Sequence, residues 1–266
     1  MTTNRQNIDK VLRVCIGTEP KTAIPCKVLQ YSIQKHLSPA YQVEFHLMQG
    51  ESWRSNPTLG QGTGFSLLRW QIPEYLQYSG LSLYLDADQL VFGDIYEVFA
   101  LALNDLQNPN RPSVYCTFQK DKWFPSPPYA PNTSVMLIDC EKAKEDWPTF
   151  EALCQSLEND PLRKRYVQVM HGLHLKTPPA LISSVWNQLN IKSPGCKLLH
   201  YTQEHNQPWY NPNHPNKDLW RDYLVESISS GVVTKQEIRL AVESFEPHTK
   251  NKRGTGMHPY WLKFAK

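Results

Sequence analysis

The first fifty residues contain a strand, a helix and a second strand, and this order most constrains the fold. Residues 11–17 (VLRVCIG) form a β-branched run that ends in glycine, which is typical of a buried strand. Pro25 suits a first helical turn, and apolar residues then recur at helical spacing as far as Ser38 and Pro39. Residues 41–48 (YQVEFHLM) alternate apolar and polar positions, as a strand does. Because strands joined through a helix pair in parallel, the sequence predicts an α/β fold with a mixed, mainly parallel sheet flanked by helices.

The alternation of strands and helices continues downstream. Strands are predicted at 81–92, 113–118, 133–139 and 196–201, helices at 65–76, 141–170, 219–228 and 234–245, and loops at 50–64 and 122–131. Gly231 suits the end of the helix at 219–228, and Thr234 with Glu237 forms a capping box at the start of the helix at 234–245. The loop at 122–131 contains four prolines, so it is not expected to pair in a sheet.

The composition excludes several classes of protein. Lys and Arg number 28 against 25 Asp and Glu, and a net charge of +3 is too small for a typical nucleic-acid-binding protein. No apolar run reaches the roughly 18 residues of a membrane-spanning helix, and the polar start lacks the apolar core of a signal peptide. The six cysteines contain no C-x-x-C pair, which argues against a zinc ribbon. We therefore expect a cytoplasmic protein with reduced cysteines.

Two aspartates follow an apolar run in the segment LYLDADQLVF. Asp86 and Asp88 stand at the predicted carboxyl end of a buried strand. Open α/β sheets bind ligands outside that edge, and paired carboxylates suit a hard divalent cation that bridges phosphate oxygens. The alternative is a strand-end turn with two solvated aspartates, because so short a motif often occurs by chance. His200 ends another apolar run, where a histidine with a structural role is the alternative to a third metal ligand.

In their order along the chain, these segments resemble the motifs of glycosyltransferase family 8, which includes bacterial lipopolysaccharide sugar transferases and glycogenins. The matching segments are RVCIGTEPKTAIPCKVLQYSI (13–33), FSLLRW (65–70), LYLDADQLV (83–91), NTSVMLID (132–139) and HYTQEHNQPW (200–209). The last segment is similar to the family's H-F-x-G-x-x-K-P-W motif. The resemblance covers residues 11–209.

The resemblance implies a GT-A fold with a Rossmann-like nucleotide-binding core. It implies a single domain, 1–266, with the nucleotide-sugar and metal core at 11–209 and a helical extension with a basic tail at 210–266. The implied activity is metal-dependent transfer of a hexose, with retention of anomeric configuration, from a nucleotide sugar to a glycan or lipid-linked acceptor. The implied donor is a UDP-sugar and the implied cation is Mn²⁺ or Mg²⁺.

The resemblance also assigns roles to individual residues. It implies metal ligation by Asp86, Asp88 and His200, donor binding by Gly17, Thr18, Glu19, Arg69, Asp86, Ala87 and Asn132, and positions near the anomeric carbon for Asn132 and Gln168. Positive charge from Arg69 and a cation would stabilise the diphosphate as it leaves.

The sequence departs from the family's pattern at several of these positions. Glu19 stands where an aspartate is common, and Thr133 and Ser134 replace an alanine and a glycine beside the implied sugar site. Gln207 replaces the lysine that would bind diphosphate, and it lies one residue farther from the histidine than in the motif. The family's usual D-Q segment is not evident near residues 165–170. Gln168 is therefore only a candidate for the residue that faces the anomeric carbon.

Other readings of the same residues stay open. A phosphohydrolase of the haloacid-dehalogenase type also places D-x-D after an apolar strand, but there the first aspartate lies near the start of the domain and small residues follow it. Here Gln89 and Leu90 follow the motif. A nucleotidyltransferase would open with a glycine-rich loop that contains a basic residue, of which GTEPKTA is a poor version. A non-catalytic protein that binds nucleotide sugars is the third alternative.

The end of the chain suggests a second kind of partner. Residues 249–266 contain five basic residues and no acidic ones, interleaved with Tyr260, Trp261 and Phe264. Such segments hold proteins at anionic membrane surfaces, so this tail is expected to make peripheral contact with the inner face of the membrane. A tail that frays or docks on the protein is the alternative. The sequence does not indicate the oligomeric state.

Overall fold

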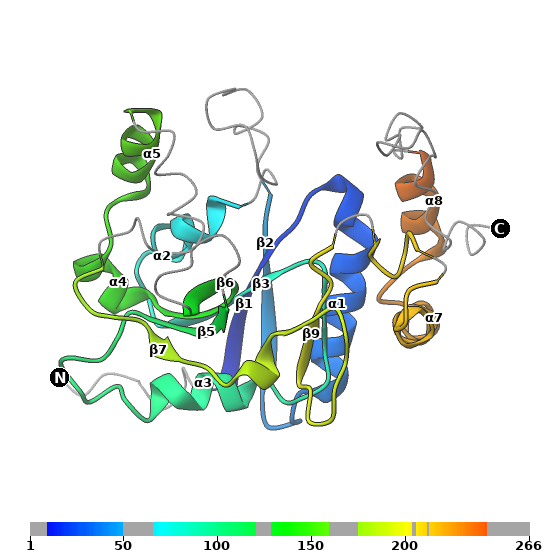
Figure 1. Ribbon diagram of the computed structural model, residues 1–266, viewed down its shortest axis with the longest axis horizontal. Coiled ribbons are helices and arrows are strands. Elements are labelled where there is room, and N and C mark those ends of the chain that lie inside the picture. Colours follow the sequence, from blue (N-terminus) through cyan, green and yellow to red (C-terminus); the bar gives the residue numbers. More distant parts are fainter. Residues whose placement is uncertain are drawn as a thin grey trace. The chain divides into compact units, whose positions relative to one another are not determined.

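The computed structural model describes residues 10–49, 66–120, 129–159, 175–203, 206–211 and 213–243. The chain divides into two compact units, and Figure 1 labels many of their helices and strands. The first unit comprises Met1–Glu19, Leu37–Asp86 and Ile95–Trp186, and the second comprises Pro20–His36, Ala87–Asp94 and Asn187–Lys266. The unit boundary therefore falls inside the D-x-D motif, directly after its first aspartate.

A six-stranded sheet forms the centre of the first unit, with the strand order β2-β1-β3-β6-β5-β7. The strands are β1 (Val11–Gly17), β2 (Gln42–Met48), β3 (Leu81–Asp86), β5 (Val114–Lys120), β6 (Tyr129–Asp139) and β7 (Ala180–Leu181). The strand β1 pairs in parallel with β2 and β3, β5 pairs in parallel with β7, and β6 runs antiparallel to both of its neighbours. The prediction of a mixed, mainly parallel sheet is confirmed.

Helices cover the sheet of the first unit. These are η4 (Leu68–Gln71), α2 (Ile72–Tyr75), α3 (Tyr96–Leu103), α4 (Cys140–Asp146), α5 (Phe150–Asn159) and the short η5 (Ser184–Trp186). The core on one face joins Cys15, Tyr84, Cys116 and Met136 of the strands with Trp70, Ile72, Ala143 and Leu153 of η4, α2, α4 and α5. Side chains alternate between the two faces of a strand, which explains why the apolar runs of β1 and β3 supply both faces.

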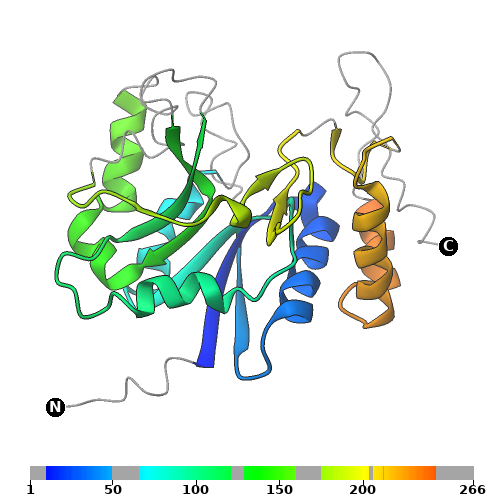
Figure 2. The same ribbon diagram turned by 60° about the horizontal axis from the view of Figure 1, so that its bottom comes forward.

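The second unit combines helices with a small sheet. Its elements are η2 (Pro20–Thr22), α1 (Ala23–His36), β4 (Gln89–Val91), β8 (Gln188–Leu189), β9 (Leu198–His200), α7 (Lys217–Ser229) and α8 (Lys235–Glu243). The three strands have the order β4-β9-β8. Figures 1 and 2 show α1 beside α7 and α8, and these helices share a core with the buried indoles of Trp209 and Trp220. The hydroxyl of Ser32 in α1 accepts a hydrogen bond of 3.0 Å from Val91 N and so ties that helix to β4.

The predicted capping box and the predicted glycine after the preceding helix are confirmed in the second unit. Thr234 N donates to Glu237 Oε2 at 2.9 Å, and Glu237 N donates to Thr234 Oγ1 at 3.1 Å, which is a reciprocal capping box. Gly231 follows α7 with φ of +79°, a conformation that glycine adopts without the steric penalty of a Cβ.

Three expectations need correction. The segment 141–170, predicted as one helix, begins with two helices, α4 and α5, which are separated at residues 147–149, where Pro148 cannot continue the first helix. The run predicted as one strand, 81–92, is two strands, β3 and β4, that belong to different sheets. Residues 122–131 were expected to stay outside the sheet, but Pro131 lies in β6 opposite Phe118 of β5. A proline is tolerated there because β3 pairs only with the later part of β6, from Val135 onward, so no strand needs a hydrogen bond from position 131 on that side.

Several predictions lie outside the described residues. These are the loop at 50–64, the later part of the helix at 141–170, the first residues of the proline-rich segment and the basic tail at 249–266. Within the described residues, no helix combines the length and the apolar character needed to cross a bilayer.

All six cysteines are free thiols, and five of them are buried. Burial raises the pKa of Cys116 and Cys140 to about 12 and that of Cys15 and Cys196 to about 11. Cys154 on α5 is the one that is partly exposed. Thiolates are the reactive form of cysteine, so the folded chain protects its buried thiols both by exclusion and by protonation.

We predict that a maleimide reagent at pH 8 modifies Cys154 well before the other five cysteines in the folded protein. The substitution Cys154→Ser should remove the fast phase, whereas Cys116→Ser should leave it unchanged. Peptide mass spectrometry of timed samples measures the order of labelling. Early labelling of Cys116 or Cys140 would contradict the described packing.

His214 links the stability of the second unit to pH. Its ring is buried, and Nδ1 accepts a hydrogen bond of 3.0 Å from the N–H of Asn216, the residue before α7. Burial lowers the pKa of His214 below its ordinary value. The unfolded chain therefore binds a proton more readily than the folded chain, so the free energy of unfolding falls as the pH drops through and below about 6.5.

We predict that the melting temperature decreases between pH 7.5 and pH 5.5, and that His214→Asn reduces this decrease. An asparagine oxygen can still accept the hydrogen bond from Asn216, but it does not bind a proton in this range. Part of the decrease should remain, because burial also lowers the pKa of His36. Differential scanning calorimetry at both pH values makes the comparison, and an unchanged pH dependence in the variant would argue against this role.

Candidate functional site

Asp86 ends β3 at the carboxyl edge of the large sheet. Gly17, the last residue of β1, lies opposite it in the parallel register. The carboxylate is held by two neighbours, because Tyr84 Oη donates to Oδ1 at 2.6 Å and Arg69 Nη2 lies 3.3 Å from the same oxygen. The side chain is only 14% exposed. The first aspartate of the motif is therefore oriented and charge-compensated inside the first unit.

Arg69 connects Asp86 to a distortion in β6. Its Nη1 donates to both Thr133 O and Thr133 Oγ1, at 2.7 and 2.6 Å, and its guanidinium lies 4.8 Å from the ring centre of Tyr84. The pairing of β5 with β6 shifts in register at this point, as β-bulges beside functional sites often do. The bulge allows the Thr133 carbonyl to accept from an arginine, so the guanidinium is fixed from two sides.

Asp88 and His200 face each other in the second unit. Antiparallel pairing of β4 with β9 places Gln89 opposite His200, and Tyr201 N donates to Asp88 O at 2.9 Å. His200 Nε2 lies 3.2 Å from Asp88 Oδ1. Nevertheless, buried Oδ1 accepts no hydrogen bond from any described residue.

The three residues form a group that could hold a metal ion. Only Ala87 separates Asp86 from Asp88, so the chain itself keeps the two carboxylates close. Ligand atoms of Asp86, Asp88 and His200 lie within 4.8 Å of one another. Two carboxylates and an imidazole are a suitable set for Mn²⁺ or Mg²⁺. Adjacent ligands of an octahedral ion, each about 2.1 Å from it, stand about 3.0 Å apart, which is close to the separation of Asp88 from His200.

Two buried amides contact these ligand residues. Gln207 Nε2 donates to Asp88 Oδ2 and to Tyr201 O, both at 3.0 Å. Asn187 Oδ1 lies 3.2 Å from His200 Nδ1, so that ring nitrogen donates the hydrogen bond. The carboxylate of Asp88 is thus held through Oδ2 and the imidazole of His200 through Nδ1.

The other predicted donor residues of the first unit lie near the ends of β1 and β6. Thr18 and Glu19 are buried directly after Gly17, and Thr18 N donates to Met48 O at 3.2 Å. Asn132 lies in β6, where its Oδ1 accepts hydrogen bonds from Ser134 N and Oγ. Its amide oxygen is therefore engaged within the strand, next to the residue that binds Arg69.

Of the two remaining predicted site residues, Ala87 lies within the described part of the chain and Gln168 does not. Ala87 is buried between the two aspartates of the motif. Gln168, the candidate for the position facing the anomeric carbon, lies outside the described residues.

Sequence reasoning missed Tyr84 and Asn187 as supporting residues. A signal for Tyr84 existed, because residues two apart in a strand share a face and Tyr84 precedes Asp86 by two. Asn187 carried no such signal, since it precedes β8 and meets His200 only through tertiary structure. Gln207 was recognised as a substitution of the family's lysine, but its contact with Asp88 was not foreseen.

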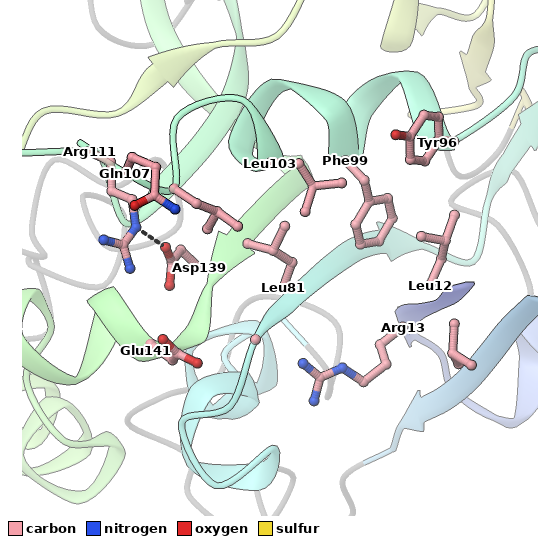
Figure 3. Close-up of a pocket in the computed structure, with 13 residues that line it drawn as sticks. Leu12, Arg13, Leu81, Tyr96, Phe99, Leu103, Gln107, Arg111, Asp139 and Glu141 are labelled. Carbon is pink, nitrogen blue, oxygen red and sulfur yellow. Dashed lines mark hydrogen bonds and ion pairs between the residues drawn. The ribbon is translucent and has the colours of Figure 1, made fainter. Parts of the chain in front are cut away.

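A separate cavity of about 390 Å³ lies at the opposite edge of the large sheet. Its lining includes Leu12, Leu81, Tyr96, Phe99, Arg111 and Asp139 (Figure 3). Leu81 begins β3 and Asp86 ends it, so the cavity and the carboxylate lie about 16 Å apart along the strand. Arg111 is engaged with Asp139, its Nε donating to Oδ2 at 2.6 Å (Figure 3). This cavity is not the site formed by the D-x-D motif.

We predict that Arg69→Met lowers the free energy of unfolding by about 3 kcal/mol, because the change removes the positive charge beside the largely buried Asp86 carboxylate and the donor to the Thr133 carbonyl. Arg221→Met serves as the control, since Arg221 forms exposed pairs with Asp218 and Asp222 on α7. The control should change stability by about 0.5 kcal/mol or less. Urea denaturation followed by circular dichroism measures both values, and equal effects would argue against a buried Arg69–Asp86 pair.

Comparison with known proteins identifies the fold. No family model matches the sequence. Protein CDI of Arabidopsis thaliana is 25% identical over 244 residues, which cover 82% of this chain and 85% of that protein.

Several solved glycosyltransferase structures are similar to this chain. The galactosyltransferase LgtC, solved with donor and acceptor sugar analogs, has a TM-score of 0.60 and 14% identity over 81% of this chain and 96% of its own. The bifunctional glycosyltransferase WbbM has a TM-score of 0.59 and 13% identity over 84% of this chain and 51% of its own. GlyE of Streptococcus pneumoniae TIGR4 has a TM-score of 0.56 and 16% identity over 84% and 64%. The chain therefore has the GT-A glycosyltransferase fold that its resemblance to family 8 predicted.

Proposed function

We propose that this chain is a metal-dependent glycosyltransferase that takes a sugar from a nucleotide donor. The observation that carries the proposal is the grouping of ligand atoms of Asp86, Asp88 and His200 within 4.8 Å of one another, with Asp88 Oδ1 3.2 Å from His200 Nε2. Asp86 lies next to this pair in sequence, and the fold is that of known glycosyltransferases. A cation bound to both the carboxylate oxygen and the imidazole nitrogen would stabilise their close approach, so this arrangement suits a bound metal.

The chemistry of the proposed reaction requires stabilisation of a leaving diphosphate. A divalent cation held by Asp86, Asp88 and His200 would neutralise negative charge on that group. Arg69 holds Asp86 in place through Oδ1. The backbone turn at Gly17 lies beside Asp86 in the sheet, where a glycine allows a ligand to approach the main chain closely.

The finer parts of the proposal come from the sequence resemblance. They are a UDP-linked hexose as donor, Mn²⁺ as the preferred cation, retention of anomeric configuration, and a glycan or lipid-linked molecule as acceptor. In this proposal Thr18 and Glu19 line the nucleoside, and Asn132 and Gln168 lie near the transferred sugar. The structure of LgtC was solved in complex with donor and acceptor sugar analogs, which supports a nucleotide sugar and an acceptor as the partners of this chain.

The alternative functions give different results in simple assays. A phosphohydrolase would cleave an aryl phosphate with Asp86 as nucleophile, but both Tyr84 and Arg69 contact Oδ1 of that residue. A non-catalytic protein would bind the nucleotide sugar without releasing the nucleotide. Release of UDP from a UDP-sugar, with water or a sugar as acceptor, distinguishes the transferase from both.

We predict that UDP with Mn²⁺ raises the melting temperature by roughly 5 to 10 °C at a ligand concentration of about 100 Kd, because binding to the folded state alone adds about 2.7 kcal/mol. The shift should be smaller with UDP alone or with a purine nucleoside diphosphate. Asp88→Asn should abolish the part of the shift that depends on Mn²⁺, since it removes a ligand charge. A thermal-shift titration with a panel of nucleoside diphosphates, with and without Mn²⁺, measures these values.

A matched variant controls for the loss of negative charge. Asp222 on α7 is exposed and contacts Arg221 alone among the described side chains, so Asp222→Asn should retain the full shift. If no nucleoside diphosphate shifts the melting temperature in the presence or absence of Mn²⁺, the proposed donor site is wrong. A shift that Asp88→Asn leaves unchanged would place the nucleotide elsewhere.

A further inference from the structure

We propose that Asn187 and Gln207 are positioning residues that fix the two metal ligands of the second unit before any metal binds. Each uses a buried amide to hold one ligand, Asn187 for His200 and Gln207 for Asp88. The inference rests on the metal site of the proposed function and adds to it the residues that set the affinity of that site. Both amides lie in the same unit as the residues that they hold.

Asn187 determines which nitrogen of His200 is available to a metal. Its Oδ1 is an acceptor, so Nδ1 of the imidazole carries the hydrogen in their 3.2 Å contact. The other nitrogen, Nε2, lies 3.2 Å from Asp88 Oδ1, so it is the nitrogen that a metal shared with Asp88 would bind. Hydrogen bonds of this kind orient the histidine ligands of most metal sites and raise their basicity.

Gln207 determines how the carboxylate of Asp88 is turned. The two hydrogens of Nε2 go to two acceptors, Asp88 Oδ2 and Tyr201 O, which also fixes which end of the amide is the nitrogen. Because Gln207 holds Oδ2, the other carboxylate oxygen, Oδ1, lies toward the imidazole of His200. Tyr201 directly follows His200, so Gln207 contacts both the segment that contains Asp88 and the segment that contains His200. The N–H of Tyr201 donates to Asp88 O and joins the same two segments through the backbone.

The burial of the two amides supports a role at this site. Asn187 is 2% exposed and Gln207 is 6% exposed, so neither amide is a surface residue that happens to lie nearby. The backbone pairing of β4 with β9 brings Asp88 and His200 together, and the two amides fix the orientation of the side chains that lie 3.2 Å apart. Ligands that are already in place bind a metal more tightly, because less ordering is required on binding.

The same contacts explain the departure from the family's motif. A lysine in place of Gln207 would bring a positive charge to the carboxylate that is meant to bind a cation. The neutral amide donates hydrogen bonds without this competition. In this chain, position 207 serves Asp88, and not the diphosphate that the resemblance assigns to the lysine.

The test measures Mn²⁺ binding by the full-length chain in the absence of nucleotide, by isothermal titration calorimetry and by the loss of the free Mn²⁺ signal in electron paramagnetic resonance. Asn187→Leu and Gln207→Met remove the polar atoms with little change in volume. We expect each substitution to weaken Mn²⁺ binding by about 10- to 100-fold, the range observed for residues that support metal ligands. Melting temperatures without metal are recorded for every variant.

A conservative variant separates positioning from a structural role. Asn187→Asp keeps an acceptor for His200 Nδ1 and should bind Mn²⁺ at least as tightly as the unchanged chain, whatever it does to the melting temperature. If Asn187→Leu does not fold, Asn187→Ala replaces it in the comparison. Gln30→Met is the matched control, since this amide of α1 contacts Cys26 Sγ and not a candidate ligand. It should retain the affinity of the unchanged chain.

The outcomes distinguish this inference from the proposed function. If the unchanged chain does not bind Mn²⁺, the metal site of the proposed function is wrong, and the inference is overturned with it. If the unchanged chain binds Mn²⁺ and both Asn187→Leu and Gln207→Met bind it equally well, the inference alone is overturned. If Asn187→Asp loses affinity as Asn187→Leu does, Asn187 has only a structural role.

Discussion

The short antiparallel ladder between β4 and β9 is the constraint on which the candidate site depends. It contains only three residue pairs, yet it places Asp88 and His200 at its end with their side chains 3.2 Å apart. Both strands are buried, so a shift in register would expose apolar side chains as well as separate the two ligands. The packing that stabilises the second unit therefore also sets the geometry of the ligands. This coupling explains why the motif occurs between two apolar strands and not in an open loop.

The fold and the grouping of the three candidate ligand residues could be predicted because their signals are local. Apolar periodicity located β1, β2 and β9, and the order of the motifs linked Asp86, Asp88 and His200 across more than 100 residues of sequence. The predictions failed where a residue's environment depends on a distant segment. Pro131 pairs in the sheet because β3 leaves that part of β6 unpaired. Nothing in the sequence near Pro131 contains this information.

The same argument explains why the supporting residues were missed. Asn187 and Gln207 are uncharged, so no charge pattern marks them, and each contacts its candidate ligand residue only through tertiary structure. The departure at position 207 was visible in the motif, but its consequence was not, because a glutamine can accept or donate with equal ease. Only the two acceptors around Nε2, on Asp88 and Tyr201, determine which of these it does.

The balance of charge at the site connects the metal to the donor. Asp86 and Asp88 contribute two negative charges, and Arg69, which contacts Asp86, is the positive side chain that a described contact places against them. The amide at position 207 adds no charge. A diphosphate that approached these carboxylates alone would be repelled, whereas a cation bound between them reverses the sign of the interaction. In such a site the metal and the nucleotide strengthen each other's binding by the same factor, as thermodynamic linkage requires. A lysine at position 207 would supply part of the attraction for the diphosphate without a metal. In the proposed function, the glutamine found here therefore makes donor binding more dependent on the metal than the lysine of the family's motif would.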